Sequence, residues 1–194
     1  MTATIIPAEV EPGVLPRRRQ LLYGTGYVAG ACGILILTLV GLYLNLRTGH
    51  RVGWLKNNNI PLTQPNMQLI TISMSMVTMQ WAVNAIGRDA RSQAYLALGI
   101  TELLGLAFVN QTWFLYTQVG VKMRQLEGAY FYATTGAHLA MVIAALIFVA
   151  LSGLRALGGS MSSRHPDGIS AAALFWHVTA ALYAVVWLGV YVLK

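Results

Sequence analysis

Glu102 is the one acidic residue that lies inside a long apolar stretch of this sequence. An ionised side chain is costly at the centre of a bilayer, so such a residue suggests a function by default. By helical spacing it shares a face with Tyr95, Leu106, Val109 and Trp113. Glu102 could relay protons or contact an ion or a lipid. The alternative is a protonated or hydrogen-bonded glutamic acid packed against another helix, and both interpretations stay open.

Two histidines, His138 and His177, lie in successive apolar stretches, and a pair of imidazoles could hold a haem iron. If both stretches are antiparallel membrane helices, each histidine lies about nine residues from a different side. At ~1.5 Å per residue in a core of ~30 Å, their heights then differ by roughly 10 Å. One iron could not easily bind both, so we interpret them as hydrogen-bonded packing residues. Haem binding by either one is kept as an alternative.

The cysteine and methionine residues give little support for a disulfide or for a metal site. The single cysteine, Cys32, excludes a disulfide within the chain, a dinuclear copper site and a cysteine-ligated cluster. Four methionines share one apolar stretch and could bind a soft metal ion, although methionine is more often a packing residue. They are Met67, Met74, Met76 and Met79.

Several aromatic residues lie near the ends of the apolar stretches, where tryptophan and tyrosine commonly anchor helices at the membrane surface. We expect this interfacial position for Trp54, Trp113, Trp176, Tyr116 and Tyr191.

The composition indicates that lipid surrounds these residues. Only 10% of the 194 residues are charged and 56% are hydrophobic, whereas soluble domains carry about 25% charged residues. The net charge of +7 does not indicate nucleic-acid binding, because the basic residues are scattered between apolar blocks. They are typical of the flanks of membrane helices.

The sequence predicts an all-α membrane protein, a bundle of five transmembrane helices in one domain over residues 21–194. Each apolar stretch reaches the ~20 residues that cross a bilayer, and helices satisfy their own backbone groups in lipid. The predicted spans are about 21–46, 66–86, 93–116, 129–154 and 169–193. The connections between them are too short for a soluble catalytic domain.

Residues 1–20 are expected to form a disordered tail with a basic anchor, Arg17-Arg18-Arg19. The anchor places the N-terminus in the cytoplasm, because basic residues beside the first span favour the inner side. An odd number of spans then puts the C-terminus outside.

Short motifs spread over all five spans resemble those of one family. The sequence Gly-Leu-Tyr-Leu-Asn-Leu-Arg ends the first span at 41–47, and the second contains Thr-Met-Gln-Trp-Ala at 78–82, with Gln80 and Trp81. The third contains Gly-Leu-Ala-Phe at 105–108, then Gln111. The fourth opens with 130–138, ending in His138, and the fifth carries Phe-Trp-His at 175–177. In order and spacing they are similar to subunit III of haem–copper terminal oxidases, the cytochrome c oxidase subunit 3 family, in its short bacterial form.

The sequence departs from the family pattern at several buried polar positions. Where that family usually has an acidic residue, this chain has Cys32, Phe114 and Ala180, and a second histidine is replaced by Met141. Conversely, Glu102 is an acid where the family is usually apolar. These departures are compatible with a scaffolding and lipid-binding role. They argue against a role in proton delivery, because the usual carboxylates are missing.

The resemblance implies a non-catalytic subunit of a respiratory oxidase that couples oxygen reduction to proton translocation. It implies a multi-pass protein of the bacterial plasma membrane that packs against the catalytic haem–copper subunit I and subunit II and binds phospholipid. Haem and copper are expected in those partners and no cofactor or metal in this chain. The residues expected to make buried polar, lipid or subunit contacts are Glu102, His138, His177, Trp176, Gln80, Trp81 and Gln111.

Two other functions stay open. One is a subunit of a related quinol oxidase or nitric oxide reductase. The other is a free-standing small proton or ion transporter that uses Glu102.

Overall fold

Five α-helices make up the fold in the computed structural model, which describes residues 18–49, 60–159 and 166–193. They are α1 (Arg18–Gly49), α2 (Thr63–Gly87), α3 (Arg91–Gln118), α4 (Leu126–Leu157) and α5 (Asp167–Val186), and a π-helical segment, η1 (Trp187–Val192), continues α5. All five helices, with η1 counted in the fifth, are long and apolar enough to cross a membrane. The prediction of an all-helical protein with five spans is confirmed.

The helices extend beyond the predicted spans at most of their ends. α1 begins at Arg18, so the last residues assigned to the tail are helical, whereas residues 1–17 lie outside the described part. α2 begins at Thr63 and takes Pro65 into its first turn, where a missing backbone N–H costs little. Hydropathy marks only the part of a helix that lies in hydrocarbon, and polar end turns continue past it.

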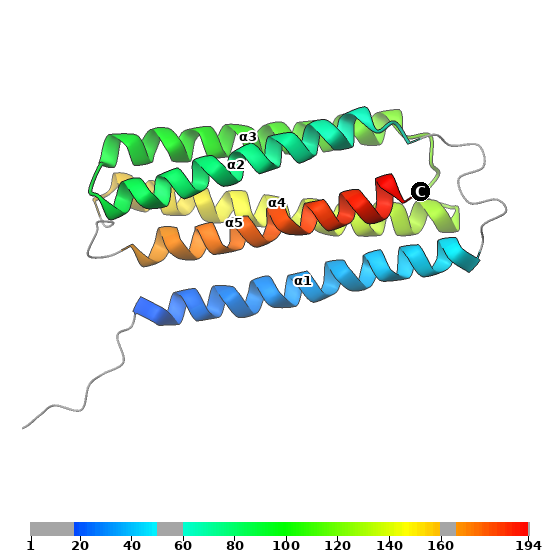
Figure 1. The fold of residues 1–194 in the computed structure, drawn as a ribbon, viewed down its shortest axis with the longest axis horizontal. Helices are drawn as coiled ribbons and strands as arrows, with labels where there is room; N and C mark the ends of the chain where they lie inside the picture. The colour runs from blue at the N-terminus through cyan, green and yellow to red at the C-terminus, as the bar shows by residue number, and fades with distance from the viewer. Residues whose placement is uncertain (1–17, 50–59, 160–165, 194) are drawn as a thin grey trace, which may run out of the picture.

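α5 is the central helix of the bundle. It contacts α1, α2 and α4, while α2 and α3 form a pair of their own (Figure 1). In the fifth span 61% of the most apolar stretch is buried inside the protein, compared with 28% in α1. The described chain starts at one end of the bundle and finishes at the other, as an odd number of spans requires (Figure 1).

Small residues let the helices approach α5 and η1 closely. Ala172, Ala173 and Ala180 of α5 are all buried. A side-chain carbon added at Gly105 of α3 would lie 2.7 Å from Trp176 of α5. Small residues leave room for neighbouring side chains to pack tightly, and packing drives helix association where the surrounding lipid is as apolar as the side chains.

The π-helical end of the last span was not predicted. There the Leu193 N–H donates to the Leu188 carbonyl at 2.9 Å, one residue further back than in an α-helix. Gly189 lies within this segment, and a side-chain carbon there would come within 2.6 Å of Val40 Cγ1. Glycine therefore lets η1 pack directly against α1.

Candidate functional site

His138 lies deep inside the bundle, with only 2% of its surface exposed. Its Nε2 lies 2.9 Å from the backbone oxygen of Thr179, and because a carbonyl only accepts, Nε2 carries the hydrogen. The ring also packs against Phe108 and Tyr183, with centroids 5.9 and 5.4 Å away. These contacts join α4 to α3 and α5.

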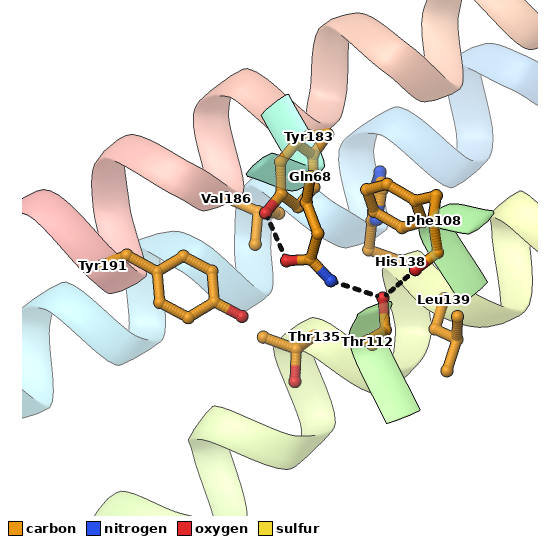
Figure 2. A pocket seen from close by; sticks show the side chains of 9 residues that line it. All are labelled: Gln68, Phe108, Thr112, Thr135, His138, Leu139, Tyr183, Val186 and Tyr191. Atoms are coloured by element: carbon orange, nitrogen blue, oxygen red, sulfur yellow. Dashed lines mark hydrogen bonds between the residues drawn. The ribbon is translucent and has the colours of Figure 1, made fainter. Parts of the chain in front are cut away.

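A small cavity of about 10 Å³ lies beside His138, which is room for about one water molecule. Figure 2 shows the side chains around it, which come from α2, α3, α4, α5 and η1. They are Gln68, Phe108, Thr112, Thr135, His138, Leu139, Tyr183, Val186 and Tyr191.

Gln68 is the centre of the hydrogen bonds at this cavity. Its Nε2 donates to Thr112 Oγ1 at 2.7 Å, and Thr112 donates onward to the Phe108 carbonyl. The Tyr183 hydroxyl donates to Gln68 Oε1 at 2.7 Å (Figure 2). It also lies 3.1 Å from the Pro65 carbonyl, so its single hydrogen is shared between the two acceptors. We did not single out Gln68 from the sequence, although a glutamine in an apolar stretch is a signal of such a network.

Trp176 is buried, with 1% of its surface exposed. Its indole N–H donates to Ser75 Oγ at 3.0 Å, and Ser75 donates to the Ile72 carbonyl. The prediction that Trp176 anchors the protein at the membrane surface is therefore wrong. Distance from a span end does not tell which face of the helix a residue occupies.

The other aromatic residues predicted at the interface differ in exposure. Tyr191, in the last turn of η1, is also buried, at 1% exposure, and so faces the other helices and not the surroundings of the bundle. Tyr116 is half-buried and donates to Thr135 Oγ1 at 2.9 Å. Trp113 faces outward with 70% exposure, as expected of a membrane-facing aromatic. Trp54 lies outside the described residues.

Glu102 is half-buried on α3. Its Oε1 is enclosed and has no hydrogen-bond partner among the residues that the structure describes. Tyr95, two turns earlier on the same edge, donates to the Ala156 carbonyl of α4 at 3.0 Å, so this edge of α3 faces α4. On the opposite edge Gln111 donates to Thr71 Oγ1 of α2 at 3.3 Å. Gln111 therefore holds α2 to α3, and Glu102 is not part of that contact.

His177, Gln80 and Trp81 lie together, away from His138. They line an open groove of about 450 Å³ on the α2–α5 side of the bundle, which also contains Asn84 and Arg88. The His177 Nδ1 lies 2.6 Å from the Ala173 carbonyl and so carries a hydrogen.

The two histidines thus have different surroundings, one in the core and one on the groove. Within residues 18–49, 60–159 and 166–193 no three His, Cys, Asp or Glu side chains form a group that could hold a metal ion. Among the described residues several buried polar side chains join two helices, and others bond to carbonyls of their own helix.

Comparison with known proteins identifies the family. The family model for cytochrome c oxidase subunit III matches residues 51–194, from the connection before α2 to the end. The chain is 33% identical to cytochrome c oxidase subunit 3 of Cyprinus carpio over 133 residues, 68% of this chain and 49% of the carp protein. It is 32% identical to that of Spodoptera frugiperda over 132 residues, which is 90% of that protein.

A third relative, cytochrome c oxidase subunit 3 of Loxodonta africana, is 30% identical over 132 residues and 51% of its length. The chain thus spans about half the length of the carp and elephant proteins. α1 lies outside the match to the family model, so the match does not test the resemblance at residues 41–47 or the departure at Cys32. The match covers most of the chain, α2 to η1, and the chain therefore belongs to the cytochrome c oxidase subunit III family.

Proposed function

We propose that this chain is a non-catalytic subunit III of a respiratory haem–copper terminal oxidase, packed against catalytic subunit I together with subunit II. The match to the family over residues 51–194 is the observation that carries the proposal. In such a complex, haem and copper belong to the partner subunits, and oxygen reduction is coupled there to proton translocation.

The buried polar groups support a structural role for the chain. Gln68, Thr112 and Tyr183 bond to one another, and Trp176 bonds to Ser75. Groups paired in this way stabilise contacts between helices and are not free to bind a substrate. The observations therefore fit a scaffold that supports the activity of a neighbouring subunit.

The proposal includes a location and an orientation. We place the chain in a bacterial plasma membrane with its N-terminus in the cytoplasm, because the arginines at 17–19 precede the first span. The start of α1 and the end of η1 lie at opposite ends of the bundle (Figure 1), so the C-terminus is then outside.

Bound phospholipid is also part of the proposal. An apolar hollow of about 390 Å³ lies between α1, α4 and α5, lined by residues such as Val28, Phe148 and Phe175. It lies near the beginning of α1, and its apolar lining would suit the acyl chain of a lipid.

Membership of the family fits a quinol oxidase or nitric oxide reductase subunit less directly than an oxygen-reducing enzyme that uses cytochrome c. The electron donor binds to other subunits, so this chain does not decide it. One observation favours the free-standing transporter: Glu102 Oε1 is enclosed and has no hydrogen-bond partner within the described ranges.

Isolation of the chain from its native membrane tests the proposal. A tagged chain, extracted in a mild detergent, should co-purify with a larger multi-span subunit that contains haem, identified by mass spectrometry. Recovery of the chain alone, or with partners that contain no haem, would rule the proposal out.

A further inference from the structure

We propose that the cavity beside His138 binds one water molecule, which joins the Gln68 amide of α2 to the Tyr191 hydroxyl of η1. Both groups donate a hydrogen bond to the water. The water in turn donates to the hydroxyl oxygens of Thr112 on α3 and Thr135 on α4. The inference concerns the interior of this chain and does not depend on the proposed function.

The cavity has the size and the polarity that a single water requires. Its volume of about 10 Å³ is that of about one water-sized probe, which is too small for an anion or an organic ligand. Cavities that stay dry in proteins are lined by apolar side chains. This one is lined by an amide, an imidazole and several hydroxyl groups as well as by apolar side chains.

The Tyr191 hydroxyl is the group at the cavity that most needs a partner. The side chain is buried, and Figure 2 shows its hydroxyl pointing into the cavity, toward the Gln68 amide. Within the described ranges no hydrogen bond joins this hydroxyl to another protein group. A buried hydroxyl without a partner is destabilising, and native proteins pair nearly all such groups with protein or with ordered water.

The Gln68 amide has one hydrogen that its protein partners do not use. The Thr112 hydroxyl donates its hydrogen to the Phe108 carbonyl and so must accept from Gln68, which places the amide nitrogen on that side. The amide oxygen accepts from Tyr183. The nitrogen carries two hydrogens, and only one goes to Thr112. The second remains for the water.

The two threonine oxygens have room for the hydrogens of the water. Thr112 Oγ1 accepts from Gln68, Thr135 Oγ1 accepts from Tyr116, and each donates to a carbonyl of its own helix. A hydroxyl oxygen has two lone pairs, so each threonine keeps one. Two donors and two acceptors around the water make four hydrogen bonds, within the usual range for a buried water.

The cavity lies near one end of the bundle, so a water has a short way to reach it. Gln68 lies in the second turn of α2, Thr112 in the second-last turn of α3 and Tyr191 in the last turn of η1. These ends meet at the end marked C in Figure 1. At ~5.4 Å per turn the depth is about 10 Å, compared with a bilayer core of ~30 Å.

The water connects two sets of hydrogen bonds that are otherwise separate. Tyr183, Gln68 and Thr112 form one set, and Tyr116 and Thr135 form the other. It also gives the π-helical end of the last span a polar attachment to α2, α3 and α4.

Replacement of Tyr191 by phenylalanine tests the proposal, because a bound water and a dry cavity predict opposite results. With water bound, Tyr191→Phe removes a hydrogen bond. The midpoint of thermal unfolding of the full chain, in the complex in which it is isolated, should then fall by about 2–4 °C. In a dry cavity the change removes only a hydroxyl without a partner, so the midpoint should stay the same or rise. Tyr27→Phe is the matched control, because Tyr27 is 81% exposed and its change should leave the midpoint unaltered.

A density map of the unchanged chain, at a resolution that shows ordered waters, guards against a variant that fails to fold. We expect one peak about 2.7–3.2 Å from both Gln68 Nε2 and Tyr191 Oη. A cavity without such a peak, or a midpoint that is unchanged or higher in Tyr191→Phe, would overturn the proposal. Neither measurement uses haem or a partner subunit, so failure of the proposed function would leave both valid.

Discussion

At the scale of single residues, the buried polar side chains pair across helices. Trp176 of α5 bonds to Ser75 of α2, and Tyr183 of α5 bonds to Gln68 of α2. Hydrogen bonds between membrane helices contribute about 0.6 kcal/mol on average and up to about 1.7. Each bond alone is modest, and together they fix how α2 rotates against α5.

The Trp176–Ser75 bond gives a direct test of this pairing. Trp176→Phe and Ser75→Ala should each lower the thermal stability of the purified complex. A double-mutant cycle should give a coupling energy of about 1 kcal/mol, because the second change removes nothing further once the bond is lost.

Trp113→Phe is the matched control for that cycle. Trp113 is 70% exposed, so its replacement should change stability little. Strictly additive effects of Trp176→Phe and Ser75→Ala would show that the bond does not contribute.

The sequence showed which polar and aromatic residues lie within the spans, but it did not show what surrounds each of them. His138 lies in the core with its Nε2 bonded to a backbone carbonyl, and Trp176, expected at the membrane surface, is buried as well. In a membrane helix both the lipid-facing and the helix-facing sides are apolar, so hydrophobic spacing does not identify the buried face. Gln68 was missed because, unlike Gln80 and Gln111, it lies in none of the motifs that carry the family resemblance.

At the scale of the elements, close packing around α5 depends on glycines at particular positions. A side-chain carbon at Gly105 of α3 would overlap Leu146 of α4 and lie 2.7 Å from Trp176 of α5. At Gly99, on the same helix, no atom lies within 4 Å of the added carbon. The two glycines differ in surroundings while sharing a helix.

Gly105→Ala should therefore destabilise the bundle, by about 1–3 kcal/mol as for other overpacked cores. Gly99→Ala should leave stability equal or raise it by up to about 1 kcal/mol, because alanine favours the helix. Thermal unfolding of the two purified variants makes the comparison. If both variants had the same stability, the packing of the Leu146 and Trp176 side chains against Gly105 would be contradicted.

The existence of each helix was predictable from hydropathy, and its ends were not. Polar turns continue α1 back to Arg18 and α2 back to Thr63, where hydropathy gives no signal. The π-helical turns of η1 depend on contact with α1 at Gly189, a tertiary effect that local sequence does not reveal.

At the scale of the whole molecule, the bundle is arranged around one central span. α1, α2 and α4 pack against α5, and α3 packs against α2 and α4 (Figure 1). The number of spans could be predicted from the sequence alone. Which helix packs against which could not, because every span has apolar residues on all of its faces. The match to the subunit III family then suggests a larger assembly around the bundle.

We propose that this chain supports an oxidase whose redox centres lie in other subunits. The most direct measurement is the reduced-minus-oxidised visible spectrum of the complex purified through a tag on this chain, before and after the chain is dissociated with a harsher detergent. We predict haem bands in the intact complex that stay entirely with the partner fraction after dissociation. Haem bands that remain with this chain, or no haem in the intact complex, would contradict the account.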